Sequence, residues 1–250
     1  MSYLLNPYSY TSNFVPTDIS GLILWLDASD TSTITESSGA VSQIDDKSGE
    51  DNHFTQATGG QQPTTGTTTI NSLNALQFDG GDYMKHESMG YPTSGVIFMV
   101  AKVNTVDNPT DSLWCIDDAS DYQAQATGVI FAGSIYRFTI NNNNMPNIVY
   151  TTGDLSGTNH IFMYRHDYSD GAMDQWVDGV PGDGNGATDY TTPYTTPIDT
   201  ILMANRSETN YPDADFGEWL IYDTALSVAD MNTVGEYLAD KWGITWTTIT

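Results

Sequence analysis

The fold is decided by residues 21–63, GLILWLDASDTSTITESSGAVSQIDDKSGEDNHFTQATGGQQP, together with residues 216–244, FGEWLIYDTALSVADMNTVGEYLADKWGI. The first stretch opens with an apolar strand pattern, Leu22 to Leu26, and continues through turns rich in Asp, Ser and Gly. The second joins a strand pattern to a helix pattern. Together they predict an all-β domain that ends in one helix.

Between these stretches the chain is a series of short apolar runs separated by Gly, Asn, Asp and Pro. Runs of this kind favour strands, and a long series of them is typical of a two-sheet sandwich. The predicted strands are Leu22 to Leu26, Val41 to Asp45, Leu76 to Asp79, Val96 to Val103, Ser112 to Ile116, Val129 to Ala132, Tyr136 to Ile140, Asn147 to Tyr150, His160 to His166, Met173 to Val177, Thr200 to Ala204 and Phe216 to Tyr222. Asp178-Gly179 is a favoured two-residue hairpin turn, because Gly accepts a positive φ.

One helix is predicted near the C-terminus. Ser227 offers a capping hydroxyl, Asp230 stands three residues later, and Gly243 ends the pattern. Apolar residues recur at helical spacing at Val228, Met231, Val234, Tyr237, Leu238 and Trp242. We interpret this stripe as the face that packs on the sandwich rather than as a ligand platform.

Several of these positions carry a resemblance to a known fold family. They are Leu22 to Leu26 with Asp27 to Asp30, the turn Asp46 to Gly49, Asn52, Gln62-Pro63, Ala75 to Gly80 with Asp82-Tyr83, Gln175 to Gly179, and Gly217 to Ile244. In them the chain resembles concanavalin A-like, laminin-G-like jelly-roll domains of the type found in phage structural proteins. The resemblance covers nearly the whole chain, although the middle third matches only in general pattern. It implies a two-sheet antiparallel jelly-roll sandwich, and it says little about ligands because this fold hosts many functions.

The domain organisation is expected to be simple. No linker or repeat interrupts residues 17–250, which we interpret as one domain preceded by an extended arm, residues 1–16. Pro7 and Pro16 discourage a helix in the arm. Its apolar and aromatic residues, the predicted attachment residues, are Tyr3, Leu4, Leu5, Tyr8, Tyr10 and Phe14. Such a segment either packs on its own domain or anchors the domain to a neighbouring subunit or capsid shell.

The charge balance restricts the partners. Seven Lys and Arg face 32 Asp and Glu, a formal net charge of -25. Nucleic acid is therefore not expected as a partner, because its phosphates would be repelled. Most of the acids are Asp, which favours turns. Three explanations of the acidity stay open: solubility in salty surroundings, calcium binding in loops, and attraction to a cationic partner.

The sequence shows neither a signal-peptide pattern at residues 1–16 nor a stretch of about 18 apolar residues that would cross a membrane. The single cysteine, Cys115, excludes an intrachain disulfide and is expected to be a small buried residue. The concanavalin A-like domains that this chain resembles usually work outside the cell. We therefore expect a protein that is assembled in a host cytoplasm and carried on a virion, or otherwise an extracellular protein.

No catalytic residue is predicted. The glucanases of the resembling family use a Glu-x-Asp-x-x-Glu strand motif, and none of the six glutamates here is followed by Asp two positions later. The four histidines form no HExxH pair, and His160 and His166 would lie more than about 18 Å apart on one extended strand. The chain is therefore expected not to be an enzyme.

Two acidic loops are candidates for Ca²⁺. One contains Asp213 and Asp215, and the other contains Asp117, Asp118 and Asp121. Carboxylates of this kind bind Ca²⁺ together with backbone carbonyls, but in turns they are also often simply solvated. No other cofactor is expected.

Two loops carry the ingredients of a sugar site, which needs an aromatic ring beside hydrogen-bonding side chains. One loop offers Tyr122 and Gln123. The other offers Arg206, Asn210 and Tyr211. Loops on a rigid sandwich are where binding normally occurs.

The sequence thus favours a non-enzymatic virion structural protein, most concretely a phage capsid decoration or fibre-like appendage with a lectin-like domain. The alternative is a free-standing carbohydrate-binding module, with or without calcium, and a third possibility is a glycoside hydrolase with an unrecognised site. The expected partners are capsid or other structural proteins and host surface glycans. A symmetric homo-oligomer is expected as well.

Overall fold

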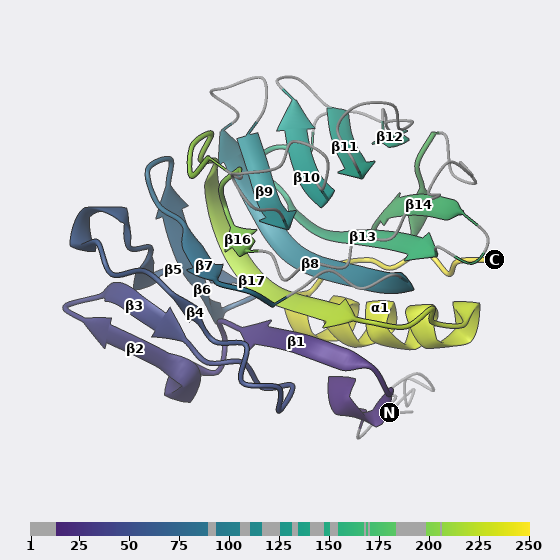
Figure 1. Cartoon of the computed structure of the whole chain (residues 1–250), viewed down its shortest axis with the longest axis horizontal. Coiled ribbons are helices and arrows are strands. Elements are labelled where there is room, and N and C mark those ends of the chain that lie inside the picture. Colours follow the sequence, from purple (N-terminus) through teal and green to yellow (C-terminus); the bar gives the residue numbers. More distant parts are fainter. Residues whose placement is uncertain are drawn as a thin grey trace, which may run out of the picture.

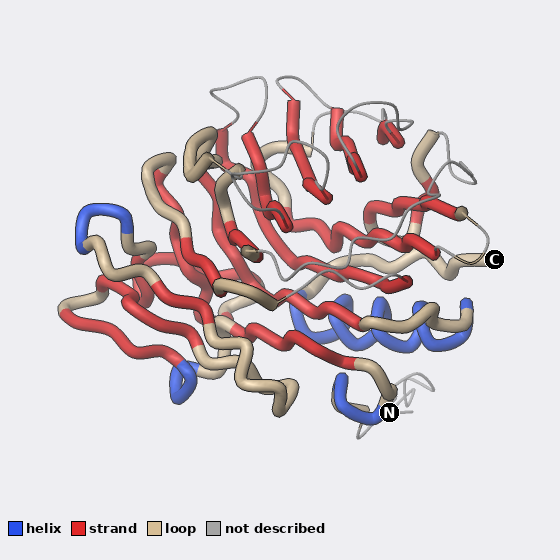
Figure 2. The backbone as a smooth tube through the Cα atoms, viewed as in Figure 1, coloured by secondary structure: helices blue, strands red, loops and turns tan. Residues whose placement is uncertain are grey.

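The protein is represented by a computed structural model, in which strands are the predominant secondary structure (Figure 1). The described residues are 14–89, 94–105, 111–116, 126–131, 135–140, 148–150, 155–167, 169, 171–183, 199–205 and 207–250; for 126–131, 135–140 and 148–150 only the backbone is described. Figure 2 shows strands spread over two layers and one long helix along the outside of one of them.

The first sheet is built around the long strands β8 and β17. One edge of β17 pairs with β6 and then with β1, and its other edge pairs with β8. Beyond β8 follow β13, β14 and β15, and β5 flanks β6. The bounds are β1 (Leu22–Asp27), β5 (Thr64–Ile70), β6 (Leu73–Asp79), β8 (Ser94–Thr105), β13 (Asn159–Asp167), β14 (Ala172–Val177), β15 (Val180–Pro181) and β17 (Asp213–Tyr222).

The second sheet runs in the order β12, β11, β10, β9, β16, β7, β4, β3, β2, and all these pairs are antiparallel. The bounds are β2 (Ile34–Ser37), β3 (Ala40–Ile44), β4 (Phe54–Thr55), β7 (Met84–His86), β9 (Asp111–Ile116), β10 (Ala126–Phe131), β11 (Ile135–Ile140), β12 (Ile148–Tyr150) and β16 (Thr200–Leu202). One pairing, Ala40 opposite Thr64, joins the two sheets along an edge.

The predicted fold class, a two-sheet antiparallel sandwich with one C-terminal helix, is confirmed, and each predicted strand is present with small shifts at its ends. Five strands were not predicted: β2, β4, β5, β7 and β15. They lack a clear apolar pattern, because β2 and most of β5 are half-buried or exposed and the other three have only two or three residues.

Strand β8 explains how one sheet serves two cores. Its side chains alternate, as the period of two requires. Ile97 and Met99 pack between the two sheets, in a core that also holds Trp114 of β9. Val96 and Phe98 pack on the other side, under the helix. With both faces covered, residues 96–101 of the strand read as the continuous apolar run VIFMVA. Each fully buried large side chain of this kind contributes roughly 1.5–3 kcal/mol.

The helix α1 (Val228–Trp242) is capped as predicted. The Ser227 hydroxyl accepts a hydrogen bond from the Asp230 amide at 3.1 Å, and Gly243 ends the helix with a φ of 69°. The predicted apolar stripe faces the first sheet, apart from Val228, which is 45% exposed in the first turn. No helix among the described residues is long and apolar enough to cross a membrane.

A buried carboxylate fastens α1 to the first sheet. Glu218 of β17 is fully buried, and it accepts hydrogen bonds from the indoles of Trp25 and Trp242, each at 2.7 Å. The Tyr237 hydroxyl donates to it at 2.9 Å, and the Lys241 ammonium lies 2.7 Å away. A buried charge with this many partners is strongly bound in place, and removing a partner is costly.

Candidate functional site

A row of side chains faces outward from the second sheet. Lys85 of β7 lies opposite Ile201 of β16, which lies opposite Cys115 of β9. The neighbouring row, which includes Leu202 and Trp114, belongs to the core between the sheets. Since side chains alternate along a strand, the row with Lys85 points away from that core. Cys115 is buried in a small cluster on this outer side, as the sequence predicted for it.

Two tyrosines stand on this outer side. The rings of Tyr83 and Tyr211 are stacked, with centroids 5.9 Å apart and planes 23° from parallel. Tyr83 is 7% exposed, whereas Tyr211 is half-buried. The side-chain amide of Gln61 lies 3.5 Å from the Tyr211 hydroxyl. We call Gln61, Tyr83, Lys85, Glu208 and Tyr211 the tyrosine site.

An ion pair borders the two rings. Lys85 Nζ lies 2.9 Å from Glu208 Oε1, and the Tyr83 hydroxyl donates a hydrogen bond to Oε2 of the same carboxylate. The hydrogen bond from Tyr83 holds the pKa of Glu208 below its usual range, with Lys85 adding to the effect. The hydrogen bond to Glu208 in turn raises the pKa of Lys85. Both groups therefore stay charged at neutral pH.

The loop between β16 and β17 presents Glu208 in a tightly turned backbone. Met203, Glu208 and Asn210 have positive φ angles of 60°, 51° and 57°. Oδ1 of Asn205 accepts hydrogen bonds from the amides of Ser207 and Thr209, at 2.9 Å and 3.1 Å, which holds the turn closed. Non-glycine residues in this region each cost on the order of 1–3 kcal/mol and tend to occur at functional sites.

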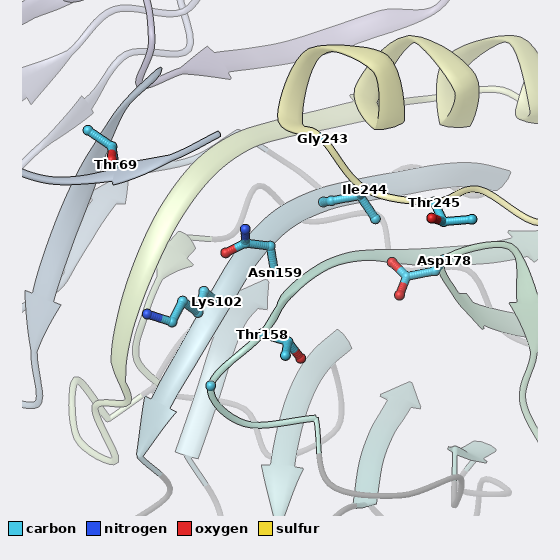
Figure 3. Close-up of a pocket in the computed structure, with 9 residues that line it drawn as sticks. Thr69, Lys102, Thr158, Asn159, Asp178, Gly243, Ile244 and Thr245 are labelled. Carbon is cyan, nitrogen blue, oxygen red and sulfur yellow. The ribbon is translucent and has the colours of Figure 1, made fainter. Parts of the chain in front are cut away.

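A polar groove lies on the opposite side of the molecule, where α1 ends (Figure 3). The groove is open to solvent and has a volume of about 600 Å³. Lys102 of β8 and Asn159 of β13 are opposite each other in the sheet, and Val100, two residues before Lys102, packs under the helix. These strands thus place both polar side chains on the helix face of the first sheet. The lining residues are Thr69, Lys102, Gly157, Thr158, Asn159, Asp178, Gly243, Ile244 and Thr245.

Hydrogen bonds fix the walls of this groove. Asp178 accepts from the Ile161 amide at 2.8 Å, and its other carboxylate oxygen lies 2.7 Å from Nδ1 of His160. The second ring nitrogen of His160 lies 2.7 Å from the Thr158 hydroxyl. Asp178 also accepts, through its backbone carbonyl, a hydrogen bond of 2.8 Å from the Thr247 amide. The segment after α1 is therefore tied to the predicted Asp178-Gly179 hairpin turn, which is confirmed by φ angles of 54° and 77°.

The predicted calcium residues Asp213 and Asp215 point to the same side, as expected. Both carboxylates lie within hydrogen-bond distance of the Asn104 amide, at 3.0 Å and 3.4 Å, and Asp215 also lies 3.7 Å from Lys102 Nζ. Among the described residues no group of three or more His, Cys, Asp or Glu side chains is arranged to hold a metal ion. Calcium binding stays a prediction.

Several predicted residues fall outside the described part of the chain: Tyr3, Leu4, Leu5, Tyr8, Tyr10, Asp117, Asp118, Asp121, Tyr122, Gln123 and Arg206. Of the predicted attachment residues, Phe14 is described, and its ring lies 5.6 Å from that of Tyr237 on α1. Of the predicted sugar residues, Tyr211 belongs to the tyrosine site, and the neighbouring Asn210 accepts a hydrogen bond from the Ser112 amide through its carbonyl.

Sequence reasoning missed most of the tyrosine site. Tyr83, Lys85 and Glu208 were not predicted as binding residues, because the pairing of β7 with β16 that brings them together was not predicted. A tyrosine and a lysine at positions i and i+2, which share one face of a strand, were the available signal. The groove was missed as well, since it depends on where the segment after α1 lies.

No family model matches the sequence, and neither does the sequence of any curated protein. Solved structures of similar fold were found. A sialidase of Trypanosoma rangeli has a TM-score of 0.64 and 13% identity over 91% of this chain and 34% of the sialidase chain. The binding domain of Paraclostridial Mosquitocidal Protein 1 has a TM-score of 0.64 and 14% identity over 91% of this chain and 56% of that one.

A third similar structure is domain 4 of AbnA, an extracellular GH43 arabinanase from Geobacillus stearothermophilus, in complex with arabinotriose. Its TM-score is 0.62, with 13% identity over 86% of this chain and 98% of that domain. This chain therefore matches nearly all of the arabinanase domain but spans only about a third of the sialidase chains.

These likenesses correct the prediction that the chain is not an enzyme. Its architecture recurs in chains of a sialidase and an arabinanase, so the missing Glu-x-Asp-x-x-Glu motif does not separate it from glycoside hydrolases. The predicted phage and virion role gains no support from these structures. What they establish is the fold: a β-sandwich domain shared with chains of a sialidase, an arabinanase and a mosquitocidal protein.

Proposed function

We propose that this chain is a carbohydrate-binding domain and that the tyrosine site holds the sugar. One observation carries the proposal: the stacked Tyr83 and Tyr211 rings stand directly beside the Lys85–Glu208 ion pair on the outer side of the second sheet. An aromatic surface flanked by a fixed donor and a fixed acceptor suits a polyhydroxylated ring. The fold supports this assignment, because a domain of similar structure was solved with arabinotriose.

Each residue has a distinct role in the proposed contact. The half-buried ring of Tyr211 provides the surface on which the apolar face of a sugar lies. Lys85 Nζ, with three hydrogens, donates to a hydroxyl, and Glu208 accepts from one, since each carboxylate oxygen has a second lone pair. Because the two are already paired at 2.9 Å, their positions are set before a sugar arrives, which lowers the entropy cost of binding.

The test compares wild type with Tyr211→Ala and Tyr211→Phe on a panel of immobilised glycans that includes arabinotriose and sialylated oligosaccharides. Wild type should bind at least one glycan, Tyr211→Phe should keep most of the affinity, and Tyr211→Ala should lose about tenfold or more. A wild type that binds no glycan, or a Tyr211→Ala variant that binds as wild type does, would overturn the proposal. Thermal unfolding of each variant checks that the fold is intact.

Repeating the same measurement with a chelator tests the predicted use of calcium. If Asp213 and Asp215 hold Ca²⁺ that the sugar needs, binding is lost with chelator and returns with added Ca²⁺. Binding that is unchanged by the chelator would show that the sugar needs no Ca²⁺.

A further inference from the structure

We infer that the groove at the end of α1 is a second sugar site, which takes one neutral sugar unit. This inference rests on the proposed carbohydrate-binding function and extends it to a part of the chain that has no role in the tyrosine site. The cavity of about 600 Å³ is within the range of small-molecule sites, roughly 300–1,000 Å³.

The lining has the composition that a neutral sugar requires. Lys102 and Asn159 offer donors, Asp178 offers acceptor lone pairs, and the hydroxyls of Thr69 and Thr245 serve as either. Ile244 supplies one apolar side chain. Figure 3 shows Lys102 and Asn159, which lie on adjacent strands, at one side of the groove and the segment from Gly243 to Thr245 at another.

Lys102 is engaged more loosely than the other lysines. Lys47, Lys85 and Lys241 each have a carboxylate oxygen within 2.9 Å. Lys102 Nζ lies 3.7 Å from its ion-pair partner within the described part of the chain, Asp215. The Lys102 side chain is 33% exposed. Its ammonium therefore has hydrogens available for a ligand in the groove.

The walls are set before a ligand binds. Asp178 is oriented by the Ile161 amide and by His160, and the segment after α1 is fixed at both ends. Gly243 begins it with the helix cap, and Asn232 closes it by accepting from the Ile249 amide at 2.8 Å and donating to the Ile249 carbonyl at 3.0 Å. A rigid polar groove binds with a smaller entropy cost than one that must close around its ligand.

Electrostatics decides which kind of sugar fits. The groove is lined by Asp178 as well as by Lys102, Asp215 lies 3.7 Å from Lys102, and the chain has a net charge of -25. A carboxylated sugar would be repelled by this field, whereas hydroxyl groups meet both donors and acceptors without that penalty. The groove therefore favours a neutral sugar over an acidic one.

The two sites lie on opposite sides of the domain. The tyrosine site is on the outer side of the second sheet, and the groove is on the helix face of the first. One sugar unit cannot touch both, so a domain with both sites holds two units or two chains of a polysaccharide at once. Attachment at two points raises the overall affinity for a polymer above that of either site.

The test is an amide-resolved NMR titration with arabinose, galactose, glucose and mannose, and with glucuronate as the charged comparison. We expect the amides of Lys102, Asn159 and Thr245 to shift with at least one neutral sugar, also in the Tyr211→Ala variant. Asn159→Ala should weaken this response about fivefold, and Thr245→Ala should weaken it as well. Thr35→Ala, an exposed change on β2, serves as the control and should leave the response unchanged.

The outcomes separate this inference from the proposed function. Shifts at Glu208 and Tyr211 without shifts in the groove overturn the second site and leave the first. Groove shifts with glucuronate alone, or groove shifts that Asn159→Ala and Thr245→Ala leave unchanged, also overturn it. Wild-type protein whose groove amides shift while the amides of the tyrosine site do not would support the second sugar site. The same result would overturn the proposal that Tyr211 holds the sugar.

Discussion

The hydroxyl of Tyr83 donates a hydrogen bond to Oε2 of Glu208, which lies 125 residues later in the chain. The two meet because β7 pairs with β16 and each carries one side of the tyrosine site, Tyr83 just before β7 and Glu208 in the loop after β16. The contact joins the aromatic pair to the ion pair, so the ring surface and the charged groups move as one unit.

Tyr83→Phe separates these two parts. The ring stack with Tyr211 stays, while Glu208 loses the hydrogen bond that is the largest cause of its lowered pKa. We expect a loss of sugar affinity of about three- to tenfold, because Glu208 is less firmly held, with little change in thermal stability. Titration calorimetry with the glycan identified on the panel measures the effect. An affinity equal to that of wild type would show that the hydroxyl does not position Glu208 for binding.

Glu218→Gln tests the buried network between α1 and the first sheet. The amide cannot accept all four donors, and Lys241 loses its closest counter-charge, although Asp27 remains 2.9 Å from it. We expect a loss of about 3 kcal/mol in the free energy of unfolding, measured by urea denaturation. Glu236→Gln, an exposed change on α1, is the matched control and should cost far less. Equal effects of the two changes would contradict the network.

Gly179→Ala and Gly157→Ala form a matched pair. Both glycines have φ near 77°, so alanine is strained at each by roughly 1–2 kcal/mol. At Gly157 an alanine methyl carbon would have nothing within 4 Å, whereas at Gly179 that carbon would stand 1.8 Å from the carbonyl oxygen of Thr247. Gly179→Ala should therefore destabilise the protein more than Gly157→Ala does. The overlap with Thr247 should add about 1–3 kcal/mol to the backbone strain that both variants share. Similar denaturation midpoints for the two variants would mean that the segment after α1 is not packed on the hairpin turn.

Asp82 gives a pH-dependent prediction. Burial, with repulsion from Asp79 adding to it, raises the pKa of this carboxyl from 3.8 to about 6. Because of the raised pKa, the folded protein binds the Asp82 proton more tightly than the unfolded chain does. The contribution of this proton to the stability of the fold is complete below pH 3.8 and is lost as the pH rises through 6. Asp82→Asn, which stays neutral, should be more stable than wild type by about 1 kcal/mol above pH 7 and lose this advantage toward pH 4.

Thermal unfolding of both proteins across this pH range gives the comparison. Asp240→Asn, an exposed change on α1, provides the reference for the general effect of removing one negative charge. A stability difference for Asp82→Asn that does not vary with pH, or that varies as it does for Asp240→Asn, would contradict a raised pKa.

Local sequence patterns predicted the helix, the turn and the long strands of this protein well. The cap at Ser227, the stop at Gly243 and the Asp178-Gly179 turn depend on neighbouring residues alone, and all three are present. The long apolar strand β8 was also readable, since burial on both faces leaves few polar residues. Such features need no knowledge of which strands become neighbours.

The candidate sites could be read only in small part. Tyr211 was predicted from loop composition, but Tyr83 and Lys85 reach it through the pairing of a three-residue strand, MKH, that has no apolar pattern. Glu218 shows the same limit: a glutamate within the buried run FGEWLIY is visible in the sequence, whereas its partners Trp25 and Lys241 come from a distant strand and from the helix. Sequence spacing cannot supply these contacts.

The pairing of β1 with β17, in which Leu22 lies opposite Tyr222, has a consequence for how the chain folds. The strand β1 is synthesised long before its partner β17, and pairings between segments so distant in the sequence slow folding to roughly milliseconds to seconds. Until β17 emerges from the ribosome, the apolar run Leu22 to Leu26 has an unsatisfied edge. A nascent chain that stops before Tyr222 would therefore be the species most prone to aggregate.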